Sequence, residues 1–292
     1  MGKAERNRAR NARERIAVQQ AAASRAEQRR RLLIVGSSVG LVLVIVIVLI
    51  LVKDLAKPGK HLGSSNLPPA VAHDITNVPA STLAKVGTGA LPTTGLPLKA
   101  ITDKPLTGAG KPEMLYIGAE FCPFCGAMRW PMAVALSRFG TFGTLTGIHS
   151  APKPEVYPNT PTLTFRSQKY TSPYLTFVPI EHQKVNHQIL QPVTKAQQAL
   201  WVKYDNSAQG PSYPFIDFGN KIVLTGPLFN PQVLHGLTWA QVAQQLKNPS
   251  STVGMNVNAA ANYITASICK MTNNKPASVC TAAPIASIES KL

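Results

Sequence analysis

The hydrophobic and polar positions divide the chain into segments of unlike pattern. Leu32 to Val52 reads LLIVGSSVGLVLVIVIVLILV, an apolar run without any charged side chain. About 20 apolar residues in a helix span the hydrocarbon core of a bilayer, because each residue rises about 1.5 Å. The pattern therefore predicts one transmembrane helix over residues 32–52.

The charges that flank this run predict its orientation. Residues 29–31 are all arginine, whereas the segment 53–57 mixes lysine with aspartate. The positive-inside rule places residues 1–31 in the cytoplasm as a basic tail and everything after the run outside the membrane. A cleaved signal peptide is the alternative, but such peptides have shorter apolar regions and a small-residue cleavage site. We expect a retained signal anchor in the cell membrane, with an extracytoplasmic C-terminal part.

After the run, the pattern changes to that of a folded domain. Residues 53–75 are rich in Pro, Gly and Ser, which is typical of a flexible linker, and residues 76–292 form the predicted domain. The apolar spacing and the Gly and Pro positions predict the following elements: a short helix after Pro79, strands at Leu98–Ile101, Met114–Ala119 and Gly147–Ser150, a helix over Pro123–Phe139, alternating positions at Tyr170–Glu181, a helix at Val193–Tyr204, a hairpin around Gly219-Asn220, and helices at Thr238–Leu246 and Asn256–Met271.

The order of these elements predicts an α/β fold. A strand, a helix and a strand come first, and a hairpin and a helix come last. Between these halves we expect a helical or irregular insertion of some sixty residues, about 151–210. Pro131 lies inside the first long helix, and we expect it to kink that helix.

Composition and charge narrow the function. The chain is 45% hydrophobic and 15% charged, which excludes wholesale disorder. The formal net charge of +17 divides between a basic tail and a long, weakly basic remainder. The tail has no interleaved aromatic residues and no recognisable nucleic-acid-binding fold. We therefore expect the tail to orient the anchor beside the lipid bilayer, and we expect no nucleic acid as a partner.

Two of the four cysteines form the strongest chemical signal. Cys122 and Cys125 make a C-x-x-C motif where the predicted strand Met114–Ala119 meets the following helix. The N–H groups and dipole of a helix N-terminus stabilise an anion, so the pKa of Cys122 should fall below its free value of about 8.5. Cys125 lies one turn further on, close enough to attack a mixed disulfide formed at Cys122. The motif predicts thiol–disulfide chemistry.

A zinc site is the main alternative for these cysteines. Structural zinc normally needs a second closely spaced pair of ligands. Cys269 and Cys280 are eleven positions apart, and the six histidines are scattered. We expect no metal and no bound cofactor. A purely structural disulfide between Cys122 and Cys125, or an accidental spacing, are further alternatives.

The motifs around the first cysteine pair resemble a known family. A strand followed by FCPFC, a kinked helix, and a hairpin and helix that begin with Tyr-Pro resembles the thioredoxin-like superfamily. The stretches YIGAEFCPFCGAMRW, ALSRFGTF, VYPNTPT and YTSPYL carry a closer resemblance. The closer resemblance, over about residues 75–275, is to a prokaryotic domain-of-unknown-function family of membrane-anchored thioredoxin-like proteins. The resemblance implies a thioredoxin-like fold, a nucleophilic Cys122, a resolving Cys125 and a cis-proline that faces them.

The resemblance also implies substrate-binding positions. We assign the cis-proline to Pro214, because it precedes the first strand of the predicted hairpin, and we expect Tyr213 to contact the substrate. Pro158 and Pro161 are the alternatives for the cis-proline. Pro123 and Phe124, between the cysteines, complete the predicted substrate-binding set.

Two further features leave alternatives open. The superfamily often has a buried acidic group beneath the resolving cysteine, and Glu120 and Asp217 are the weak candidates here. Cys269 and Cys280 are expected to form a structural disulfide, and a relay that passes electrons to the first pair is the alternative.

The sequence thus predicts a membrane-anchored thiol–disulfide oxidoreductase. We expect protein thiols and disulfides as substrates, a redox partner protein or membrane redox component, and a mild preference for oxidase or isomerase chemistry. The alternative is a non-catalytic surface binding module that uses the insertion to hold a partner.

Overall fold

The computed structural model describes residues 64–92, 94–205 and 210–292. These residues lie in one compact unit that extends from Pro58 to Leu292. The predicted cytoplasmic tail, the predicted transmembrane helix and the first part of the predicted linker lie outside them. Within the described ranges, no helix is both long enough and apolar enough to cross a bilayer.

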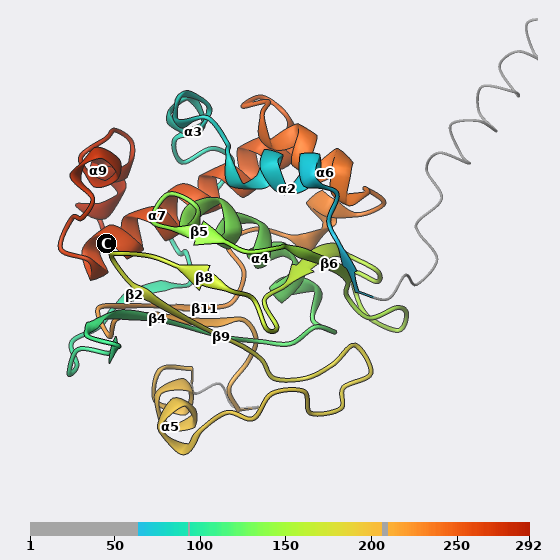
Figure 1. Cartoon of the computed structure of the whole chain (residues 1–292), viewed down its shortest axis with the longest axis horizontal. Helices are drawn as coiled ribbons and strands as arrows, with labels where there is room; N and C mark the ends of the chain where they lie inside the picture. The colour runs from blue at the N-terminus through green and yellow to red at the C-terminus, as the bar shows by residue number, and fades with distance from the viewer. Residues whose placement is uncertain (1–63, 93, 206–209) are drawn as a thin grey trace, which may run out of the picture. The chain divides into compact units, whose positions relative to one another are not determined.

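The described residues form a mixed α/β structure with eight α-helices and three β-sheets (Figure 1). The strands are β1 (Ser65–Asn66), β2 (Leu98–Ala100), β3 (Thr107–Gly108), β4 (Lys111–Gly118), β5 (Thr141–Phe142), β6 (Thr146–His149), β7 (Pro161–Thr164), β8 (Tyr170–Thr171), β9 (Thr176–Glu181), β10 (Phe215–Phe218) and β11 (Ile222–Thr225). The helices are α2 (Pro69–Thr76), α3 (Ala80–Val86), α4 (Pro123–Leu136), α5 (Lys195–Tyr204), α6 (Trp239–Leu246), α7 (Ala259–Met271), α8 (Ala277–Cys280) and α9 (Ile285–Glu289), with a 3-10 turn η1 (Pro231–Leu234) and a π turn η2 (Gly254–Asn258).

The strand β4 is the centre of the main sheet. It pairs in parallel with β9 on one side and antiparallel with β10 on the other, and β11 and β2 continue the sheet beyond β10. The short β3 pairs with the first residues of β4. Because β4 has neighbours on both sides, its backbone groups are satisfied within the sheet and its C-terminal end is held firmly in place.

Both faces of this sheet are covered, because successive side chains of β4 point to opposite sides. Met114 and Tyr116 belong to the large core formed with α4 and α7, whereas Leu115 and Ile117 pack with Trp201 of α5 in a smaller core. In Figure 1, α4 and α7 lie on one side of the sheet and α5 lies on the other. This explains the continuous apolar run of β4, which has no face for water.

The expected insertion over residues 151–210 is corrected by the structure. Its strand β9 pairs with β4 over six residues in the middle of the main sheet, so the segment supplies part of the central fold. The expected second strand, Gly147–Ser150, corresponds instead to β6, which pairs with β1 and β7 in a separate sheet. The segment that contains β9 belongs to the central fold because its side chains are buried: Ile180 packs with Trp201 of α5 in the smaller core.

The expected linker over residues 53–75 also ends earlier than predicted. Its last residues form β1 and α2, where Leu67, Val71 and Ile75 are buried. Val71 and Ile75 are spaced four apart on one face of α2, and together with Leu67, which lies just before the helix, they join the large core. Pro68 and Pro69, which favoured a linker in the sequence, mark the start of the helix, where a proline costs little.

Several local predictions are confirmed. The hairpin β10–β11 turns at Gly219 and Asn220, which both have positive φ angles, 67° and 56°. Glycine and asparagine adopt that backbone region more readily than other residues. Thr238 caps α6 through a reciprocal capping box with Gln241.

The second cysteine pair is bonded. Cys269 of α7 and Cys280 of α8 form a disulfide, with a sequence separation of 11. Both side chains are buried in the large core beside α9. The bond therefore ties the C-terminal helices to α7.

We expect the Cys269→Ala/Cys280→Ala variant to be less stable by about 3 kcal/mol, because opening a loop of this length restores entropy to the unfolded chain. Urea unfolding followed by circular dichroism measures the change. The Cys122→Ala/Cys125→Ala variant, which also replaces two buried cysteines but breaks no disulfide, is the matched control. Equal unfolding midpoints for the two variants would contradict a stabilising role for the bond.

Candidate functional site

The candidate site lies where β4 ends and α4 begins. Cys122 is the N-cap residue of α4, Pro123 occupies the first turn, and Cys125 lies within that turn. Proline suits this position, because the first N–H groups of a helix have no partner inside the helix. Both thiols are free and buried, with 5% of Cys122 and none of Cys125 exposed.

The surroundings of the two thiols differ in their effect on charge. The Cys122 sulfur accepts a hydrogen bond from the Cys125 backbone N–H at 3.2 Å. Burial acts to raise the pKa of Cys122, but hydrogen bonds from Cys125 and the charge of Arg129 outweigh it, and the net pKa lies below its ordinary value. Burial raises the pKa of Cys125 well above its ordinary value, and the neighbouring Cys122 raises it further. The pair thus has one thiol that favours the thiolate and one that favours the protonated form.

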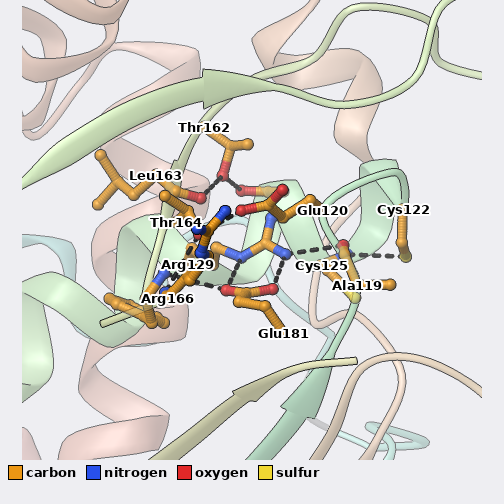
Figure 2. A network of polar contacts seen from close by, with 12 residues as sticks. Ala119, Glu120, Cys122, Cys125, Arg129, Thr162, Leu163, Thr164, Arg166 and Glu181 are labelled. Atoms are coloured by element: carbon orange, nitrogen blue, oxygen red, sulfur yellow. Dashed lines mark hydrogen bonds and ion pairs between the residues drawn. The ribbon is translucent and has the colours of Figure 1, made fainter. Parts of the chain in front are cut away.

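A buried ion pair connects α4 to β9 beside the cysteines (Figure 2). Arg129 donates from Nε to Glu181 Oε1 at 2.9 Å and from one terminal nitrogen to Oε2 at 2.5 Å. That same terminal nitrogen donates to the Ala119 carbonyl at 2.7 Å. The backbone N–H of Phe165 also donates to Glu181 Oε1, at 3.0 Å. Both charged side chains are completely buried.

The strand β7 is hydrogen-bonded to the helix α4. The Thr162 hydroxyl donates to the Gly126 carbonyl at 2.8 Å, and Trp130 Nε1 donates to the Pro161 carbonyl at 2.9 Å. The neighbouring Thr164 hydroxyl donates to Glu120 Oε1 at 2.7 Å. These contacts hold the first turns of α4 against the strand.

Aromatic side chains surround the cysteine pair. Tyr213, Phe121 and Phe124 pack against the cluster of Ala119, Cys122 and Cys125. The Phe121 ring lies 4.0 Å from the ring of His187, centre to centre, and 6.0 Å from that of Tyr213. The Tyr213–Pro214 peptide bond is cis, which is the isomer predicted for Pro214.

Two hollows open beside these rings. One, of about 330 Å³, lies between residues 151–156 and the side chains of Val185 and His187. The other, of about 590 Å³, is lined by Glu120, Pro152, Arg166 and residues 184–186. They share Pro152 and Val185, so together they form a surface depression on one side of the C-x-x-C motif. Val156 in this region is 73% exposed.

The structure brings most of the predicted site residues together. Cys122, Pro123, Phe124 and Cys125 form the start of α4, and Tyr213 packs against them just before the buried Pro214. Their roles in substrate binding and catalysis stay predictions. Cys269 and Cys280 belong to a different core. Among the described residues, no three His, Cys, Asp or Glu side chains form a cluster that could hold a metal ion.

The prediction for the buried acidic group is corrected. Glu120 bonds Thr164, and Asp217 bonds the backbone N–H of Asn220 at 2.6 Å in the hairpin turn. The acid that is coupled to the cysteines is Glu181, through Arg129. The sequence did contain a signal for this pair. Arg129 is the one charged residue of α4 and Glu181 is the one charged residue of β9, and a buried charge needs a partner of opposite sign.

Comparison with known proteins gives one match. The family model described as Domain of unknown function (DUF929) matches residues 98–270. This stretch covers more than half of the 292 residues and includes both cysteines of the C-x-x-C motif. No curated protein and no solved structure matches the chain significantly.

We expect Cys122 to be alkylated at a lower pH than an ordinary thiol. In the Cys125→Ser variant, the serine hydroxyl and backbone N–H preserve donors toward the Cys122 sulfur, so the thiolate persists as the pH falls below about 8.5. The rate of reaction with iodoacetamide as a function of pH measures this. The Cys122→Ser variant, which leaves Cys125, should react only at higher pH. A midpoint for Cys122 at or above 8.5 would contradict the prediction.

Asp217 gives a prediction on pH-dependent stability. Burial raises its pKa to about 7, and its Oδ2 has no hydrogen-bond partner among the described residues. The unfolded carboxyl titrates near 3.9, so the fold loses stability as the pH rises from about 4 through 7. Asp217→Asn cannot ionise and should be more stable than the wild type by roughly 1–4 kcal/mol at pH 8, with little difference at pH 4. Urea unfolding at the two pH values measures this, and a pH-independent difference would refute it.

Proposed function

The chain belongs to the DUF929 family, a domain of unknown function, and we propose that it is a thiol–disulfide oxidoreductase that acts on protein thiols. The observation that carries the proposal is the position of Cys122 at the N-cap of α4. There the Cys125 N–H and the Arg129 charge lower its pKa, and Cys125 follows one turn later. This is the environment that makes a cysteine a good attacking and leaving group at neutral pH.

The arrangement of elements supports a thioredoxin-like fold. The strand β4 leads through C-x-x-C into α4, β9 runs parallel to β4, and β10 and β11 form an antiparallel hairpin on its other side. The helix α7 then packs beside α4. This order agrees with the thioredoxin-like fold that the sequence motifs imply, in which an extended polypeptide binds beside the cysteine pair.

The proposed reaction is an exchange of disulfides. In the oxidising direction, a substrate thiolate attacks the Cys122 sulfur of the Cys122–Cys125 disulfide, and Cys125 leaves and takes up a proton, which its raised pKa favours. A second substrate thiolate then attacks the substrate sulfur of the mixed disulfide and releases Cys122 as a thiolate. The substrate loses two electrons and two protons, and the cysteine pair gains the electrons. The reducing direction is the reverse sequence.

The surface beside the cysteines supports a polypeptide substrate. The rings of Phe121, Phe124 and Tyr213 pack against the pair. One hollow is lined by His187, whose ring contacts Phe121, and the other by Glu120, which precedes Phe121 in the chain. A small thiol such as glutathione can react through contact with the Cys122 sulfur alone. A protein substrate also has residues on both sides of its cysteine, and these residues need a surface to which they can bind.

The location of the reaction follows from the predicted anchor. We place the domain outside the cell membrane, held by residues 32–52 to the lipid bilayer. An oxidoreductase in that position needs a redox partner protein or a membrane redox component to restore its cysteine pair.

A binding module is the second candidate. The observation that favours it is the burial of both thiols beside a surface depression that could hold a partner without chemistry. The two candidates differ in whether the cysteines exchange disulfides at all.

We expect Cys122→Ser to abolish disulfide exchange, because it removes the sulfur that attacks the substrate, and Cys125→Ser to accumulate mixed disulfides, because it removes the resolving thiol. Both are measured with the full-length protein in its reduced form and a protein substrate that contains scrambled disulfides, which the Cys122 thiolate can attack, by non-reducing electrophoresis and mass spectrometry.

The Cys269→Ser/Cys280→Ser variant is the matched control and should exchange as the wild type does. Loss of exchange in that variant, while it remains folded, would indicate a relay instead of a structural bond. Absence of exchange in the wild type would refute the enzymatic function and leave the binding module.

A further inference from the structure

The buried pair of Arg129 and Glu181 takes no part in the bond exchange itself, and Arg129 acts on the cysteines only through its charge. Removing a guanidinium and a carboxylate from water is unfavourable by several kcal/mol each, even when they pair. The pair lies among apolar side chains: Arg129 is followed in the chain by the buried Trp130, and Glu181 is preceded by the buried Ile180. Its position beside the cysteines suggests a contribution to their chemistry.

The geometry places the cation, not the anion, toward the sulfurs. Arg129 follows Cys125 by four residues, one helical turn, so both side chains lie on the same face of α4. Its guanidinium donates to the carbonyl of Ala119, and Ala119 packs in one cluster with both cysteines. The second terminal nitrogen is buried and has no hydrogen-bond partner among the described residues. Figure 2 shows the guanidinium between Glu181 and the loop that carries Ala119.

The carboxylate is fully engaged elsewhere. Each Glu181 oxygen accepts from Arg129, and one of them also accepts from the Phe165 backbone N–H. Both oxygens thus accept hydrogen bonds from donors other than the cysteines. The pair therefore acts on the sulfurs through its electric field and not as a proton carrier.

We infer that Arg129, oriented by Glu181, stabilises the dithiol of Cys122 and Cys125 in its thiolate form and thereby makes the corresponding disulfide an oxidant of substrate thiols. The inference rests on the proposed function and specifies its direction. A thiolate is charged and a disulfide is neutral, so a buried cation stabilises the reduced state alone. A couple whose reduced form is stabilised has a more oxidising disulfide.

Two phenols near the sulfurs add no charge to this field at neutral pH. Burial raises the pKa of Tyr116 and of Tyr213, so both phenols are neutral near pH 7. Glu120, at the end of the loop after β4, bonds the Thr164 hydroxyl. The charge of Arg129 acts to lower the pKa of both cysteines. The guanidinium is thus the positive group that acts on the pair.

The test compares variants in their equilibrium with glutathione. Arg129→Met/Glu181→Gln removes both charges while it keeps the side-chain volumes close to the original. We expect its equilibrium constant for disulfide formation to rise at least tenfold, which corresponds to a potential about 30 mV more reducing. We also expect the pH midpoint of Cys122 alkylation to move upward. Glu181→Gln alone keeps the positive charge of Arg129 without its counter-charge. In this variant we expect the equilibrium constant for disulfide formation to fall and the pH midpoint of Cys122 alkylation to move downward.

The matched control is a second ion pair with no contact to the cysteines. Lys203 donates to Asp103 Oδ2 at 2.6 Å on the surface of α5. Asp103→Asn/Lys203→Met should leave the equilibrium constant within twofold of the wild type.

The outcomes separate this inference from the proposed function. If the wild type does not equilibrate with glutathione, the proposed function itself fails. If the wild type equilibrates and a folded Arg129→Met/Glu181→Gln variant has the same constant, only the role of Arg129 is refuted. If that variant does not fold by circular dichroism, Glu181→Gln decides, and an unchanged constant and alkylation midpoint there would overturn the inference. A purely structural pair would change the unfolding midpoint and neither of these two quantities.

Discussion

The pairing of one buried cation with one buried anion is the constraint on which the centre of this protein depends. Arg129 comes from the helix that carries the cysteines, and Glu181 comes from the last position of the strand parallel to β4. Each charge destabilises the core more when the other is absent, because an isolated buried charge is more costly than a paired one. The helix α4 and the strand β9 must therefore pack in one register, which also fixes the loop of Ala119 between the guanidinium and the sulfurs.

The cysteine site follows from this register. The end of β4 supplies the turn, the N-terminus of α4 supplies N–H groups, and the Arg129 guanidinium supplies a positive charge from within the core. The first two features are local and occur wherever a strand leads into a helix. The third depends on a strand more than fifty positions away. The site combines a local thiol-activating position with an electrostatic field that the surrounding fold provides.

The predictability of the fold differed between its local and its distant contacts. The hairpin at Gly219-Asn220 and the capping box of α6 were predicted correctly, because each depends on a few adjacent residues whose backbone preferences are strong. The role of β9 was missed, because TFVPIE reads as one short apolar segment among several, and pairing with a strand sixty positions earlier has no local signature. The helix α2 was missed for the same reason: its prolines suggested a linker, and its buried face packs against α6, which is far away in the sequence.

For the site, the sequence was sufficient to identify the C-x-x-C motif and its place at a helix start, since these depend on spacing and on the chemistry of each residue type. The resemblance to a known family, and not the spacing, led to the choice of Pro214 as the cis-proline. The identity of the buried acid depended on the packed core. Glu120 lies close to the motif in the sequence and Asp217 lies in the predicted hairpin, yet Glu120 bonds Thr164 and Asp217 bonds Asn220. Glu181 is the carboxylate that pairs with Arg129. Electrostatic coupling depends on distance through the folded core, and that distance is decided only when strands and helices far apart in the chain pack together.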